Sequence, residues 1–375
     1  MMNKIVKTMN ILIYAGIIFI LLSSCGKTHD YKIVEKIFLE NELYFSKKKF
    51  KNVAFVKKNR VVLLYLSKRN ITIIPDDISE LSELKEISLS NNKIKVLPES
   101  FSLLSKLEFL SITSNQLTKL PDNFNQLKAL KCLSISGNKI NALPPEFGKL
   151  QSLRTLSFSH IKYFSNDFAD LSKLRSISFG DDILTTTIPL EIFSISSLES
   201  LSVGGDKFKI IPSEIKKLKK LKYLRLHGVF TDIPESIGYL NQVKSMTLTG
   251  SYKALPASIS GMKSLKCLIL KSRELRTLPE QIYDLKYLEE INLDRNSIQY
   301  LPNGISRLKS LKEFYLGDNN LTGLPDDLFE TTHWKREDGY VLSIGGNKIC
   351  NVTEKQDEWL KTFISPRWRS SQRCK

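Results

Sequence analysis

The sequence has little of what enzymatic active sites are usually built from. It contains only 4 histidines among 375 residues, and these form no spaced ligand set with the 5 cysteines. Neither a nucleophile elbow nor a phosphate-binding loop is present. The histidines are His29, His160, His227 and His333. We therefore expect a protein that is not an enzyme, with no catalytic residue, no metal and no cofactor.

A hydrophobic run long enough to cross a membrane is also missing. The apolar run Ile11–Leu22 has 12 residues, whereas a membrane-spanning helix needs about 20. Lys4 and Lys7 precede the run, and small residues follow it. This order is typical of a secretory signal peptide. We therefore assign residues 1–24 to a signal peptide that takes no part in the fold.

The end of this run resembles the lipobox of bacterial lipoproteins, and it reads Leu22-Ser23-Ser24-Cys25. In that family the cysteine receives a diacylglyceryl group and becomes the mature N-terminus. The resemblance implies that Cys25 is the lipid attachment site. It also implies an exported protein anchored to a bacterial membrane, at the outer membrane or cell surface. The alternative is an ordinary secretory signal that is cleaved near Ser24.

Acidic residues are few relative to basic ones, with 39 Asp and Glu against 56 Lys and Arg and a formal charge of +17. Such an excess favours anionic partners and says nothing about the fold. Export argues against nucleic acid and leaves anionic glycans, lipid head groups or acidic proteins. Lys216, Lys217, Lys219 and Lys220 form a local cluster. They are either an anion-binding patch or ordinary solubilising charges.

One pattern of apolar residues recurs along most of the chain, usually every 23 residues. One unit consists of Leu84, Ile87, Leu89, Asn92, Ile94, Leu97, Phe101 and Leu104. The units start at Val61, Leu84, Leu107, Leu130, Leu153, Leu174, Leu198, Leu221, Val243, Leu265, Leu288 and Leu311. A degenerate unit around Leu342 follows. Eleven of the 13 prolines occupy one slot of the unit, from Pro75 to Pro325, where a residue with fixed φ and no N–H suits a turn.

This pattern resembles the leucine-rich repeats with an L-P-x-x-[IF]-x-x-L half, which occur in bacterial surface proteins and in eukaryotic Ras-pathway scaffolds. The resemblance covers residues 61–352, or about 12–13 units. It implies an α/β repeat solenoid, a horseshoe with a concave parallel β-sheet and an irregular or 3₁₀ convex side. The asparagine of each unit satisfies backbone groups in the turn. In units Leu153 to Leu265 other residues fill that slot, through drift or because the middle is bent to suit a partner.

Each end of such a solenoid needs a cap. Residues 25–60 hold the anchor and the N-terminal cap, where Val34, Ile37, Phe38 and Leu43 indicate a helix. Residues 353–375 form the C-terminal cap. Thr353 and Gln356 resemble a capping box at the start of a helix there. The helix would carry Val352, Trp359, Leu360 and Phe363, and Pro366 would close it.

The few cysteines fall into two groups. Export implies an oxidising compartment, so Cys350 and Cys374 in the C-terminal region are predicted to form a disulfide. Cys132 and Cys267 occupy the same concave position six units apart. At about 4.8 Å per strand they lie about 29 Å from each other, so they are predicted to be free thiols.

Alternation along each strand predicts the binding surface. In the N-terminal half the concave positions between the leucines are mostly serine, whereas aromatic and charged residues appear in the C-terminal half. The preferred ligand-binding residues are Tyr223, Arg225, His227, Ile269, Lys271, Asn292 and Tyr315. We expect them to bind a partner protein. The alternatives are a solvated face without a hot spot, a binder of anionic polysaccharide or lipopolysaccharide, and a periplasmic scaffold subunit of an enzyme complex.

Overall fold

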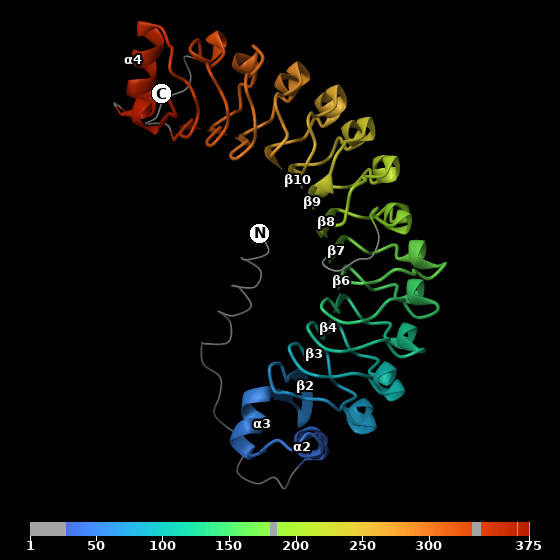
Figure 1. Cartoon of the computed structure of the whole chain (residues 1–375). Helices are drawn as coiled ribbons and strands as arrows, with labels where there is room; N and C mark the ends of the chain where they lie inside the picture. The colour runs from blue at the N-terminus through green and yellow to red at the C-terminus, as the bar shows by residue number, and fades with distance from the viewer. Residues whose placement is uncertain (1–27, 181–185, 332–338, 366, 375) are drawn as a thin grey trace.

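The computed structural model describes residues 28–180, 186–331, 339–365 and 367–374. Its repeat units follow one another along an arc, with the β-strands on the inner side and short helices on the outer side (Figure 1). This architecture confirms the predicted solenoid horseshoe. The predicted signal peptide (residues 1–24), Cys25, His333 and Pro366 lie outside the described residues.

A 14-stranded sheet runs through the described part of the chain, with its strands in sequence order. Strands β1 and β2 pair antiparallel, and every later neighbour is parallel, from β2–β3 to β13–β14. The strands are β1 (Ala54–Lys57), β2 (Arg60–Tyr65), β3 (Glu86–Ser88), β4 (Phe109–Ser111), β5 (Cys132–Ser134), β6 (Thr155–Phe158), β7 (Ser176–Gly180), β8 (Ser200–Gly204), β9 (Tyr223–Phe230), β10 (Ser245–Gly250), β11 (Cys267–Ser272), β12 (Glu290–Asn292), β13 (Glu313–Tyr315) and β14 (Val341–Ser343).

The convex side consists of 3₁₀-helices. They are η1 (Asp76–Glu80), η2 (Glu99–Leu103), η3 (Phe124–Gln126), η4 (Phe147–Lys149), η5 (Phe168–Asp170), η6 (Leu190–Ser194), η7 (Ser213–Lys217), η8 (Glu235–Tyr239), η9 (Ala257–Gly261), η10 (Glu280–Asp284), η11 (Ile305–Arg307) and η12 (Asp326–Leu328). A proline is the N-cap of most of them, and Pro98 has φ −64°, close to the angle that its ring imposes. The leucines of the template form the core, and Leu84, Ile87 and Leu89 are fully buried.

The asparagine slot joins neighbouring units through side-chain hydrogen bonds. The Oδ1 of Asn138 accepts from the N–H of Leu117, and its Nδ2 donates to the carbonyls of Ile112 and Ile135. Asn115 and Asn319 make equivalent hydrogen bonds with the unit before each of them and within their own units. Backbone groups that would otherwise be buried unpaired are satisfied in this way, as the sequence predicted.

The middle units, which lack this asparagine, use longer strands instead. Every unit with asparagine has a strand of 3 residues, as in β5 and β13. The units from Leu153 to Leu265 have strands of 4 to 8 residues, the longest being β9. The longer strands pair over more residues, as β8 and β9 do from Ser200 beside Tyr223 to Gly204 beside His227. The change of residue in the slot marks a change of backbone conformation.

The N-terminal cap is formed by helix α2 (His29–Glu40), helix α3 (Lys47–Val53) and strand β1. Val34, Ile37 and Phe38 of α2 are fully buried against the first unit, and Leu43 is partly buried beside them. Asp30 is also buried, and its carboxylate accepts from Arg60 and from the N–H of Val61. The sequence indicated the first helix but neither α3 nor the antiparallel hairpin that β1 makes with β2.

The C-terminal cap is helix α4 (Glu354–Phe363), followed by the 3₁₀-helix η14 (Trp368–Ser371). Both hydrogen bonds of the capping box between Thr353 and Gln356 are present. Trp368 is buried, and its indole N–H donates to Asp357. Lys361, Arg369 and this indole lower the pKa of Asp357 to about 2. Described residues therefore cover the core at both ends.

Cys350 and Cys374 are joined by a disulfide, with their Cα atoms 5.7 Å apart. Cys132 and Cys267 are free. The disulfide connects the last unit to the end of the C-terminal cap.

Replacing the asparagine of a slot should destabilise the solenoid locally. Asn138→Ala leaves one N–H and two carbonyls without their partner, and we expect a loss of about 3 kcal/mol in the free energy of unfolding. Ser251→Ala is the matched control, because Ser251 occupies the same slot in a unit with a long strand. It should cost less than about 0.5 kcal/mol. Urea denaturation followed by circular dichroism measures both, and equal effects would contradict this role of the asparagine.

The disulfide should be oxidised in the mature protein and should stabilise the C-terminal cap. Closing a loop with a sequence separation of 24 residues contributes about 3 kcal/mol on the chain-entropy model. Non-reducing peptide mapping should find Cys350 linked to Cys374, and Cys374→Ser should lower the thermal midpoint. The recovery of both cysteines as free thiols would contradict the pairing.

Candidate functional site

The concave face of β9 shows how the fold presents a binding surface. Tyr223, Arg225 and His227 are exposed, whereas Leu224 and Leu226 between them are buried. Successive side chains of a strand point to opposite sides of the sheet. The core thus fixes the leucines, and the strand backbone then fixes the direction of the polar residues.

The seven preferred residues lie on β9, β11, β12 and β13, four of the five adjacent strands from β9 to β13. Arg225 lies beside Thr247, Thr247 beside Ile269, and the row continues through Asn292 and Tyr315. A second row contains His227, Thr249 and Lys271. At about 4.8 Å per strand the seven residues span about 19 Å, which is the scale of a peptide segment or one face of a small protein.

Few internal contacts hold these side chains. The hydroxyl of Tyr315 donates to Glu313 at 2.9 Å, and Nε2 of His227 lies 3.6 Å from a carboxylate oxygen of Asp206. Within the described residues Arg225 has no ion pair. Its side chain is exposed on the concave face.

A hollow of about 430 Å³ adjoins this surface on its C-terminal side. It is lined by Lys271, Asn292, Asp294, Arg295, Gly317, Asp318, Ser343 and Gly345. Gly317 and Gly345 follow β13 and β14, at the unit position that Lys271 and Asp294 occupy in the two units before Gly317. The hollow exists because these two positions have no side chain.

Acidic groups lie around this hollow. Asp294 accepts from the N–H of Gly317 at 2.6 Å, and its partial burial raises the pKa of its carboxyl group. Asp318 pairs with Arg373 of the C-terminal cap at 2.8 Å. The hollow therefore combines carboxylates with Lys271, Arg295 and the amide of Asn292, a mixed set of groups suited to polar recognition.

The free cysteines of the concave face are poorly suited to nucleophilic chemistry. Cys267 donates to Glu290 at 3.1 Å. Burial and this carboxylate raise the pKa of the Cys267 thiol to about 12, and burial also raises the pKa of Cys132. Both therefore remain thiols near neutral pH, whereas the thiolate is the reactive form.

Aromatic residues at the N-terminal end of the concave face were missed by the sequence analysis. Tyr65 and Phe109 are each 37% exposed, and Phe55 of β1 is 56% exposed. Phe55 pairs with Leu63 in the hairpin. The alternation rule would have found Tyr65 and Phe109, because they lie in register with Ser88 and Cys132. Phe55 required the hairpin to be known.

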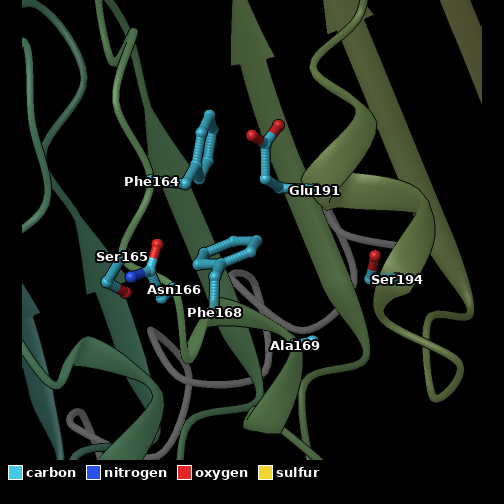
Figure 2. A pocket seen from close by; sticks show the side chains of 7 residues that line it. All are labelled: Phe164, Ser165, Asn166, Phe168, Ala169, Glu191 and Ser194. Atoms are coloured by element: carbon cyan, nitrogen blue, oxygen red, sulfur yellow. The ribbon is translucent and has the colours of Figure 1, made fainter.

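A smaller hollow of about 230 Å³ lies between η5 and η6 (Figure 2). Phe164 and Phe168 face it from one side, with Glu191 and Ser194 on the other. The unit that starts at Leu153 has 21 residues and carries Ser165 in the proline slot. We attribute this hollow to the shortened unit, and it contains none of the predicted site residues.

The described residues lack two further features. No helix there is long and apolar enough to cross a membrane. No group of three or more His, Cys, Asp or Glu side chains in the same residues could hold a metal ion.

Family comparisons identify the repeats. A model described as a leucine-rich repeat region matches residues 205–293. Two further leucine-rich-repeat models match residues 59–117, and residues 129–150 and 310–331. No curated protein matches the chain.

Solved structures with the same fold come from a bacterium, a plant and an insect. A leucine-rich-repeat protein of Leptospira interrogans is 24% identical, with 92% of this chain and 98% of that chain covered and a TM-score of 0.52. The plant peptide hormone receptor RGFR1, solved with RGF2, is 24% identical over 76% of this chain and 51% of its own, with a TM-score of 0.56. The Drosophila Toll–Spatzle complex gives 20% identity, 74% and 40% coverage, and a TM-score of 0.63. The chain thus spans about half or less of the two receptors, and these likenesses show the fold alone.

Proposed function

Because the chain folds as a leucine-rich-repeat solenoid, we propose that it is a binding protein without enzymatic activity that holds a partner protein on the concave face of β9–β13. We further propose that it is exported and anchored at a bacterial cell surface through a lipid on Cys25. The row of aromatic and charged side chains on this face supports the binding role. The resemblance of residues 22–25 to a lipobox supports the lipid anchor.

Rigidity supports the concave face as the binding surface. Tyr223, Arg225 and His227 alternate with buried leucines in an 8-residue strand that is paired on both sides. Contact with a partner therefore orders little backbone, and less conformational entropy is lost on binding. Tyrosine and arginine are also the residue types that most often dominate interface energies. The plant receptor and the Toll complex, which share the fold, were solved with protein or peptide ligands.

The charge of this face favours a protein over a polyanion as its ligand. Glu290, Asp294 and Glu313 lie among the preferred residues, on β12, just beyond β12 and on β13. An anionic polysaccharide or lipopolysaccharide would meet these carboxylates on the concave face. The basic excess of the chain, which favours such ligands, must therefore lie elsewhere on the surface.

Alanine substitutions on β9 should weaken binding of the partner. A pull-down with residues 26–375 would supply the ligand, and titration calorimetry would then compare variants. Tyr223→Ala and Arg225→Ala should each cost more than about 1 kcal/mol in affinity. Ser111→Ala and Ser134→Ala, on the same face but small, should cost far less. Lys217→Ala on the convex side is the charge control, and a loss there equal to that of Arg225→Ala would favour diffuse electrostatic capture.

Lipid attachment at Cys25 can be tested separately. In a bacterial host, Cys25→Ala should abolish partitioning into the detergent phase and release the chain from the membrane fraction, because the cysteine is the acceptor of the diacylglyceryl group. Mass spectrometry of the mature N-terminus measures the modification. Unchanged partitioning, with no lipid mass on Cys25, would favour an ordinary secretory signal.

A further inference from the structure

A column of charged residues runs along the edge of the sheet at which the strands begin. Each unit from Leu84 to Leu311 contributes one residue, the one directly after the apolar residue that starts the unit. The backbone N–H of each member donates to the carbonyl of the member before it, as from Glu108 to Lys85 and from Lys131 to Glu108, both at 2.8 Å. The members are Lys85, Glu108, Lys131, Arg154, Arg175, Glu199, Lys222, Lys244, Lys266, Glu289 and Lys312. This ladder fixes eleven charged residues at the spacing of the strands.

The charges of the column have an order. Eight members are cations, and the three glutamates recur at every fourth unit. Each glutamate pairs with at least one neighbour, as Glu108 does with Lys85 and Lys131, and Glu199 with Arg175 and Lys222. Arg154 and Lys244 each lie between two cations, and neither has an ion pair within the described residues. They are the two positions at which positive charge is least compensated.

The two residues that precede each unit's first apolar residue widen the column into a band. They add eight lysines and one acid, Glu83. The lysines are Lys106, Lys128, Lys173, Lys219, Lys220, Lys263, Lys286 and Lys309, and all of them are exposed. We call the column and these flanking residues the basic rim. It has sixteen cations and four acids, and so carries +12 of the chain's formal +17.

The shape of the basic rim favours a planar partner. The units follow one arc (Figure 1), and the edge where the strands begin lies along one side of that arc. A plane can touch the whole of such a side, whereas a polymer would have to bend along the arc. Neighbouring backbone positions of the column are about 4.8 Å apart, less than the Debye length of about 8 Å at physiological salt, so the potentials of adjacent cations add.

Two exposed tyrosines accompany the cations. Tyr287, a member of the flanking positions, is 62% exposed, and Tyr239 is 60% exposed. Nζ of Lys219 lies 5.2 Å from the centre of the Tyr239 ring. Tyrosine is enriched at the level of lipid head groups, where its ring contacts apolar groups and its hydroxyl remains in water.

We propose that the basic rim docks the solenoid side-on against an anionic lipid surface. Juxtaposed lysine and arginine side chains attract such a surface without penetrating it. The concave face lies on the inner side of the arc and stays accessible to the partner. This proposal goes beyond the protein-binding function, and it does not depend on the lipid on Cys25.

Vesicle binding tests the proposal with unlipidated residues 26–375, which contain both caps. Cosedimentation would compare phosphatidylcholine vesicles with and without phosphatidylglycerol. Arg154→Gln combined with Lys244→Gln should lower the partition coefficient on anionic vesicles about 25-fold, at about fivefold for each cation. The matched control is Lys139→Gln with Lys253→Gln, which removes the same charge from exposed sites beyond the opposite ends of the strands and should change binding little.

Equal loss in the two double variants, or equal binding of the parent to neutral vesicles, would overturn the proposal. So would binding of a soluble polyanion such as polyglutamate, with the same dependence on Arg154 and Lys244, in the absence of vesicle binding. Arg225→Ala should leave vesicle binding unchanged, so that failure of the concave site and failure of the rim are distinguishable. Thermal melts of all variants would verify folding.

Discussion

The structure depends on the parallel pairing of each repeat unit with the next. No unit can bury its own leucines or satisfy its own backbone, so both requirements are met by the neighbour. Six units meet the backbone requirement at the turn with a buried asparagine such as Asn138. The middle units lack this asparagine and have longer strands, of 8 residues in β9. The same sheet thus continues through two kinds of unit, and the longer strands of the second also carry Tyr223, Arg225 and His227.

Much of this could be predicted from the sequence, because the pattern of one unit is confirmed by the others. Leu84, Ile87 and Leu89 are buried as their spacing predicts, and alternation correctly places the concave residues. The hairpin of β1 and β2 could not be predicted in this way, because it occurs once and has no second copy in the repeat. The exposed position of Phe55 depends on this hairpin and does not follow from the repeat pattern, whereas the positions of Tyr65 and Phe109 do.

The hollow beside the concave face could not be predicted from the sequence for a different reason. It requires the absence of side chains at Gly317 and Gly345, together with Asp318, which Arg373 contacts from 55 residues further along the chain. Such a contact depends on how the C-terminal cap returns over the last unit, and no spacing rule predicts that. The basic rim is the opposite case. Its members are periodic, but their alignment on one edge becomes meaningful only through the backbone ladder that connects them.

The ladder also has a consequence for the ancestry of such arrays. Recombination between similar repeats can delete or duplicate one whole unit, and the flanking strands could still pair because their backbone register is the same. Loss of the unit from Leu107 to Ala129 would leave every remaining leucine with a neighbour. It would also remove Glu108 and bring Lys85 directly beside Lys131. Changes in copy number are therefore nearly neutral for folding, but they alter the sequence of charges along the edge, on which selection can act.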